Sequence, residues 1–292
     1  MQNYRTKLGR LGHPEILVNS LKHKKTGQGK AAANIKKTRK AEINYIPLHP
    51  KGETTESLEN ERIALLSELK KRDNEVVIKA KMEKTFSHRR LEIVEQRPLI
   101  GDFKCRWPAL FQQSEVNAEF LRITTSPLQS KFMWQLDHFS DKLLKIFKIK
   151  GGLKGHKIKE ALAISDLFEN IHIKRGCILR SIAIYLNEDP DSFFKDYQMP
   201  RGTWQSQSYT LQRDVDGQQE DVGIVIEGNI VMDNLGSVIV GFVMLLGLIY
   251  ALDLSFPDNL KHTFEFMQKV VMNLDGHKLN GKIESLKIKL FD

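Results

Sequence analysis

The chain has 292 residues, of which 41% are hydrophobic and 28% charged, which excludes a wholly disordered protein and allows one large or two small folded domains. The first 55 residues hold 12 Lys or Arg against three Glu, and the rest hold 33 basic and 33 acidic side chains, so the net charge of +9 lies at the amino end. Two cysteines, Cys105 and Cys177, exclude a disulfide framework and favour an intracellular protein, nuclear or cytoplasmic.

Residues 1–53 are predicted to form a disordered basic arm, because they show no apolar period. Met1–Arg10 lacks the apolar core of a secretion signal. One dense basic run in the arm is the candidate site for a polyanion or for nuclear import, and its cations are Lys36, Lys37, Arg39 and Lys40. Weak nucleic-acid binding through residues 22–40 would fall steeply with salt, whereas a solvated arm without a partner explains the same composition.

Residues 54–292 are predicted to form a mainly α, multi-helix globular body with one minor β-hairpin. Ser57 or a neighbouring Thr can cap the first helix, and Asn74 can cap a second that runs to Pro98. Apolar residues at helical spacing predict further helices, at residues 115–123, 128–149, 157–165, 175–187, 257–274 and 279–290. Residues 222–226 and 230–232 predict the hairpin. The polar stretch 197–220 reads as a loop, where a division of the body into two subregions would fall.

The run from Asn234 to Leu252 has no charged residue and just reaches the length that crosses a bilayer. Asp233 and Asp253 bracket it, without the nearby Lys or Arg that orients a membrane span. We therefore predict no membrane span and place this segment as a helix in the core of the body.

Other groups of polar residues that could suggest a catalytic or binding site have simpler structural explanations. Gly151–Lys157 resembles a phosphate loop but lacks its spacing, which favours a glycine turn with solvated lysines. Asp137 and His138 are neighbours on one helix and point about 100° apart, which disfavours a hydrolase dyad. The nine histidines show no metal-ligand spacing, so we predict no metal, no cofactor and no enzymatic activity. An enzyme would need a pocket that gathers dispersed side chains such as Glu169, His172, Asp189 and His262.

Short sequence segments spread over the chain resemble one family, and they include Leu11–Glu15, Gly52–Glu59, Arg106–Phe111, Glu115–Phe120, Tyr185–Pro190 and Tyr250–Leu254. Together they resemble the C-terminal region of the sterile alpha motif domain-containing protein 3-like family. The resemblance implies no catalytic residues. It also implies a small helical interaction domain upstream in full-length relatives, which would self-associate or bind partner domains. Residues 1–55 are too polar to build that domain, so we expect this chain to lack it, as a fragment or truncated relative would.

These features favour a non-enzymatic protein-interaction or scaffold module, in which a groove between helix faces would hold a partner helix. The alternative is a nucleic-acid-associated protein that binds through its basic arm. The sequence leaves the protein partners and the oligomeric state open.

Overall fold

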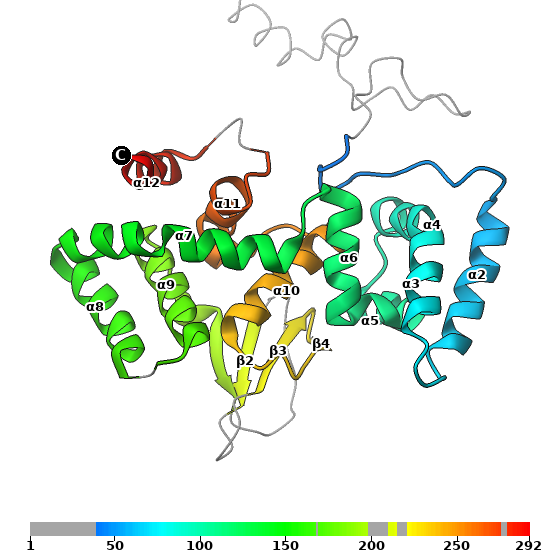
Figure 1. Cartoon of the computed structure of the whole chain (residues 1–292), viewed down its shortest axis with the longest axis horizontal. Helices are drawn as coiled ribbons and strands as arrows, with labels where there is room; N and C mark the ends of the chain where they lie inside the picture. The colour runs from blue at the N-terminus through cyan, green and yellow to red at the C-terminus, as the bar shows by residue number, and fades with distance from the viewer. Residues whose placement is uncertain (1–38, 168, 198–209, 215–220, 276–278) are drawn as a thin grey trace, which may run out of the picture. The chain divides into compact units, whose positions relative to one another are not determined.

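Helix α10 (Val238–Ala251) is formed by the uncharged run and lies at the centre of the fold (Figure 1). The computed structural model describes residues 39–167, 169–197, 210–214, 221–275 and 279–292. Every residue from Ile239 to Ala251 is buried, so the predicted core helix is confirmed. The Ser237 hydroxyl caps its first turn by accepting the N–H of Val240 at 3.4 Å. No described helix is both long and apolar enough to span a bilayer.

The elements that pack against α10 include α6 (Gln113–Thr124), α7 (Leu128–Ile149), α9 (Ile171–Tyr185) and strand β3 (Asp221–Ile226). All four were predicted from apolar spacing, and the bounds of α7 match the prediction. The outer helices are α8 (Gly152–Leu167), α11 (Lys261–Phe266) and α12 (Gly281–Phe291), with short turns η5 (Pro190–Ser192), η6 (Asp258–Leu260) and η7 (Met267–Val271). The mainly helical prediction is thus confirmed.

The amino-terminal half of the body begins with α2 (Thr55–Glu68), which Thr54 and Ser57 cap reciprocally. The predicted second helix, up to Pro98, is instead divided into three parts. The elements that follow α2 are α3 (Glu75–Lys84), α4 (Phe86–Leu91), the π-turn η3 (Glu92–Gln96), α5 (Ile100–Arg106) and η4 (Pro108–Phe111). At the end of η3, Arg97 adopts a positive φ of 49° directly before Pro98.

The predicted hairpin is confirmed as β3 and β4 (Asn229–Met232), which pair antiparallel. Two further strands extend it to a sheet in the order β1-β2-β3-β4, namely β1 (Phe194–Tyr197) and β2 (Thr210–Asp214). Strand β2 is antiparallel to β3 and parallel to β1. It lies within the stretch read as a loop, because its strand conformation depends on pairing with β3, which polar composition does not reveal.

Residues 39–53 lie against the body rather than in a separate arm. The N–H of Ala41 donates to the carbonyl of Ile123 at 2.8 Å, and Ile43 and Tyr45 pack against the core. The ordered body therefore begins earlier than the predicted boundary at residue 54. The rest of the predicted arm, residues 1–38, lies outside the described residues.

Arg90 on α4 holds this segment in place. Its fully buried guanidinium donates to the carbonyls of Ile43 and Tyr45 on one side. On the other side it donates to Tyr250 and Ala251, at 3.1 and 2.7 Å, in the last turn of α10. Burial lowers the pKa of Arg90 to about 10. A cation at the negative end of a helix dipole, satisfied by carbonyls, ties the amino-terminal segment to the central helix.

Candidate interaction site

The predicted polyanion site is only partly within the described chain. Lys36 and Lys37 lie outside it, whereas Arg39 and Lys40 are exposed. The backbone N–H of Arg39 donates to the carboxylate of Glu42 at 2.9 Å. The structure therefore shows no arrangement of the four cations as a group.

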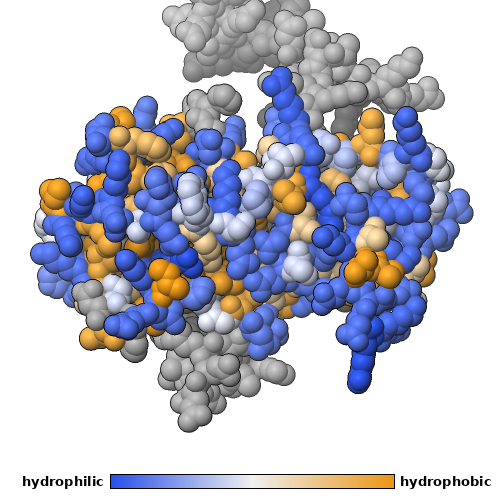
Figure 2. Space-filling model, viewed as in Figure 1, coloured by the Kyte–Doolittle hydropathy of each residue, from blue (hydrophilic) through white to orange (hydrophobic). Residues whose placement is uncertain are grey.

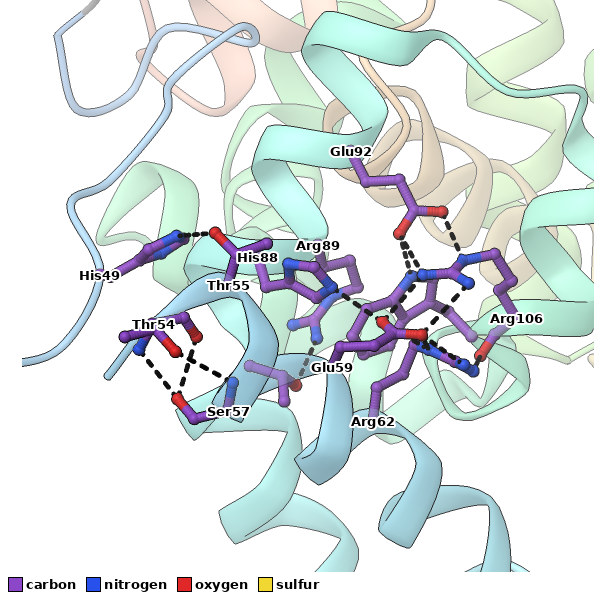
Figure 3. Close-up of polar contacts among 12 residues, drawn as sticks. His49, Thr54, Thr55, Ser57, Glu59, Arg62, His88, Arg89, Glu92 and Arg106 are labelled. Atoms are coloured by element: carbon purple, nitrogen blue, oxygen red, sulfur yellow. Dashed lines mark hydrogen bonds and ion pairs between the residues drawn. The ribbon is translucent and has the colours of Figure 1, made fainter. Parts of the chain in front are cut away.

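A network of charged side chains holds α2, α4, η3 and α5 together (Figure 3). Glu59 is its centre and contacts Arg62 at 2.7 Å, Arg106 at 3.0 Å and His88 at 3.0 Å. Arg106 also reaches Glu92 at 2.8 Å. The hydrogen bond from Arg62, with those from His88 and Arg106, lowers the pKa of Glu59 to about 2 despite its partial burial. The helix faces that look solvent-exposed in the sequence are thus joined by ion pairs.

A second, fully buried ion pair joins α4 to α6. Arg89 and Glu119 have no exposed surface and meet through two hydrogen bonds, of 2.9 and 2.6 Å. Arg122 approaches the same carboxylate at 2.8 Å and reaches Glu83 of α3 at 2.7 Å. Burial alone would raise the pKa of Glu119, but the charges of Arg89 and Arg122 hold it below the usual value. These contacts fix α6 against α3 and α4.

Helix α6 forms one wall of a groove of about 660 Å³, which α3 and the first turns of α7 complete. Its apolar lining residues are Ala118, Leu121, Pro127, Leu128 and Met133. Leu128 and Met133 are buried, whereas Leu121 is 46% exposed. A half-exposed leucine beside a buried apolar floor is surface that a complementary side chain could cover.

A polar contact fixes the shape of this groove. The side-chain oxygen of Asn117 on α6 accepts the N–H of Gln129 at 3.1 Å, in the first turn of α7. The N-cap residue of α7, Pro127, makes no side-chain cap, so the neighbouring helix satisfies this amide instead. The angle between α6 and α7 is therefore set by a hydrogen bond as well as by packing.

Trp134 follows Met133 on α7 and is 62% exposed. Its ring stacks on His138, with centroids 5.4 Å apart and planes 8° from parallel. Asp137 instead pairs with Arg175 of α9 at 2.6 Å. Asp137 and His138 therefore point to different partners, as expected from their positions on one helix.

The dispersed side chains considered for an enzyme do not share the pocket that Asp189 lines. Asp189 accepts the N–H of Asp191 at 3.3 Å and lines a groove between α8 and α9. Glu169, His172 and His262 do not line that groove. In the described part of the chain, no three His, Cys, Asp or Glu side chains come together as metal ligands.

The charged network around Glu59 and Glu92 coincides with the part of the chain that comparison with known families identifies. Residues 58–112 match the helical domain of sterile alpha motif domain-containing protein 3. The resemblance predicted from the sequence is confirmed over this segment, which covers most of α2 and all of α3 to η4. No curated protein and no solved structure matches the chain.

Sequence reasoning missed the α3–α6–α7 groove. Leu121 and Met133 belong to apolar stripes, and such stripes do not reveal which members a neighbouring helix leaves uncovered. The short interval between α6 and α7 was the available signal, since Pro127 lies four residues after the predicted helix end at 123 and forces a tight helical corner.

Proposed function

We propose that this chain is a non-enzymatic protein-interaction module that binds a helical segment of a partner protein in the groove between α3, α6 and α7. The observation that carries the proposal is an open, mostly apolar groove between helices, with Leu121 half-exposed on its wall. Amphipathic helices bind other helical domains in grooves of this kind.

The dimensions of the groove suit such a ligand. The α6 residues that line the groove run from Asn117 to Arg122, about 8 Å along the helix axis, which matches one to two turns of a partner helix. Arg122 lines this groove beside Leu121, and arginine side chains contribute strongly to the binding energy of many interfaces.

Selection of helical peptides from a display library against the full chain tests this proposal. The selected peptides should lose affinity at least about tenfold for Leu121→Glu, because that carboxylate would be buried among apolar groups. The matched control is Leu99→Glu, at an exposed leucine outside the groove. Peptides that bind Leu121→Glu and wild type equally, or a library without enrichment, would reject the groove as the binding site.

A second candidate function, nucleic-acid binding through the basic run, draws support from the exposure of Arg39 and Lys40. Replacing Lys36, Lys37, Arg39 and Lys40 by Gln should lower the number of counterions released on duplex binding by about four. The affinity would then depend less steeply on salt. The control replaces four other exposed cations by Gln, at Lys51, Lys70, Lys71 and Arg72. Equal slopes for the two variants would remove the basic run as the binding element.

A further inference from the structure

We propose that the corner where α7 meets α8 docks on the surface of an anionic phospholipid membrane. Ile149 ends α7 and Leu153 lies in the first turn of α8, and each is 85% exposed. Two large aliphatic side chains that project from one corner are costly in water. Insertion into the headgroup region of a bilayer would remove that cost.

Lysines surround this corner. Residues 142–159 contain seven Lys and no Asp or Glu. Lys145, Lys148 and Ile149 are exposed and follow the spacing of one helix face. Among the described residues, neither Lys145 nor Lys148 has a carboxylate partner. Figure 2 shows hydrophobic residues among hydrophilic ones over this end of the body.

Tyr185 brings cations from two elements to the same place. Lys150 and Lys289 each lie 5.8 Å from the centre of its ring, and Lys289 also donates to its hydroxyl at 3.0 Å. Helix α12 thereby adds a charge to the corner formed by α7 and α8. Each lysine near an anionic bilayer strengthens binding, and several act together.

The acidic residues near α8 lie in a different place. Lys154 and Lys157 line the groove between α8 and α9 together with Glu160 and Asp189. The cationic part of the docking surface is therefore Lys145, Lys148, Lys150 and Lys289, next to Ile149 and Leu153.

Glycines give the corner a fixed shape. Gly152 has a φ of +72°, which other residues rarely adopt. A Cβ on Gly155 would lie 1.9 Å from the carbonyl oxygen of Lys150, so only glycine allows the first turn of α8 to approach the end of α7 this closely. Ile149 and Leu153 therefore project from a tight turn.

The apolar tip distinguishes a membrane from a nucleic acid as the ligand. Lysines alone would serve either polyanion, but nucleic-acid surfaces offer phosphates and base edges rather than a hydrocarbon layer. Exposed Ile and Leu flanked by Lys match the two components of an anionic interface, acyl chains and charged headgroups. This binding mode needs no spanning helix and involves neither the groove nor its proposed partner.

A fluorescent label on the corner tests the proposal in the full chain. Leu153→Cys, in a Cys105→Ser background, is labelled with an environment-sensitive dye, and Val76→Cys at another exposed apolar position is the control. We expect a blue shift at residue 153, and none at 76, with vesicles of phosphatidylcholine and phosphatidylserine in equal amounts. Phosphatidylcholine vesicles alone should give none. A missing shift at 153, an equal shift at 76, or an equal shift with duplex DNA would overturn the proposal.

Vesicle co-sedimentation of unlabelled variants separates the corner from other basic segments. Ile149→Ser with Leu153→Ser should lower the partition coefficient at least about tenfold, and Lys145→Gln with Lys148→Gln about tenfold. Val76→Ser with Leu99→Ser should leave it unchanged. Wild-type partitioning of the Ile149→Ser, Leu153→Ser variant would exclude the corner as the docking element.

Discussion

At its amino end α7 places Met133 at the floor of a groove, 9% exposed, whereas at its carboxyl end it projects Ile149, 85% exposed. At the amino end an amide contact joins α7 to α6, which ion pairs hold against α3 and α4, and the carboxyl end is shaped by glycines. Met133 and Ile149 are 16 residues apart on this helix, so the two surfaces lie about 24 Å apart along its axis. A recessed apolar surface suits a complementary protein side chain, while a projecting one ringed by cations suits a lipid interface.

The largest expected effect concerns the ion pair behind the groove. Glu119→Ala leaves Arg89 buried without its carboxylate and should cost about 3–5 kcal/mol of unfolding free energy, measured by denaturant titration. The control is Glu83→Ala, which removes the 69% exposed partner of Arg122 and should cost less than about 1 kcal/mol. Equal losses of unfolding free energy in the two variants would show that the fold beside the groove does not depend on the buried Arg89–Glu119 pair.

At the corner where α7 meets α8, Gly155→Ala should lower the free energy of unfolding by up to about 3 kcal/mol, because the added methyl group meets the backbone carbonyl of Lys150. Gly151→Ala, with nothing within 4 Å, is the matched control and should be close to neutral. Hydrogen exchange should rise at the corner in the first variant while the groove stays protected. A stable Gly155→Ala protein with an unchanged corner would contradict the assigned shape.

Beneath the groove, Gly247→Ala on α10 should cost about 2 kcal/mol, since its Cβ would lie 2.5 Å from Val116 and 2.6 Å from Leu128. Val116 belongs to α6 and Leu128 to α7, so peptide binding should weaken while vesicle binding stays at the wild-type level. Gly176→Ala, with open space around it, should be neutral or stabilising. Weakened vesicle binding in Gly247→Ala would show that the two ends of α7 are coupled.

The smallest effect is a pH dependence at Glu59. Folding lowers its pKa from 4.5 to about 2, so folding favours the charged form. This stabilisation is complete above the unfolded pKa and disappears as the pH falls through the folded one. Glu59→Gln should therefore cost about 1 kcal/mol at neutral pH, a deficit that vanishes between about pH 4.5 and pH 2. A pH-independent deficit would assign the loss to packing.

The sequence predicts the parts of the fold that depend on local pattern. The apolar stripe of α7, a cap at Ser57 or a neighbouring Thr and the buried run of α10 could all be located, because each is encoded within one helix. The burial of Arg89 and Glu119 could not, since their periodicity matches a solvated face and the partners are 30 residues apart. Strand β2 was missed for the same reason, because it depends on pairing with β3.

The two proposed surfaces differ in how far the sequence reveals them. The cluster of seven Lys at the corner between α7 and α8 is visible when charge is counted over residues 142–159 alone. The zero net charge of the body as a whole hides it. The groove depends on the angle between α6 and α7, which Asn117 and Gln129 set and no spacing rule supplies. The groove therefore appears only where the packed helices α3, α6 and α7 meet.

Hydrogen exchange measured on one preparation of the full chain, with each ligand in turn, distinguishes the two ends of α7 most directly. A selected helical peptide should protect residues 118–133 and leave 145–157 unchanged, while vesicles containing phosphatidylserine should do the reverse. Protection of the same residues by both ligands, or of neither segment, would contradict the assignment of separate protein-binding and membrane-binding surfaces.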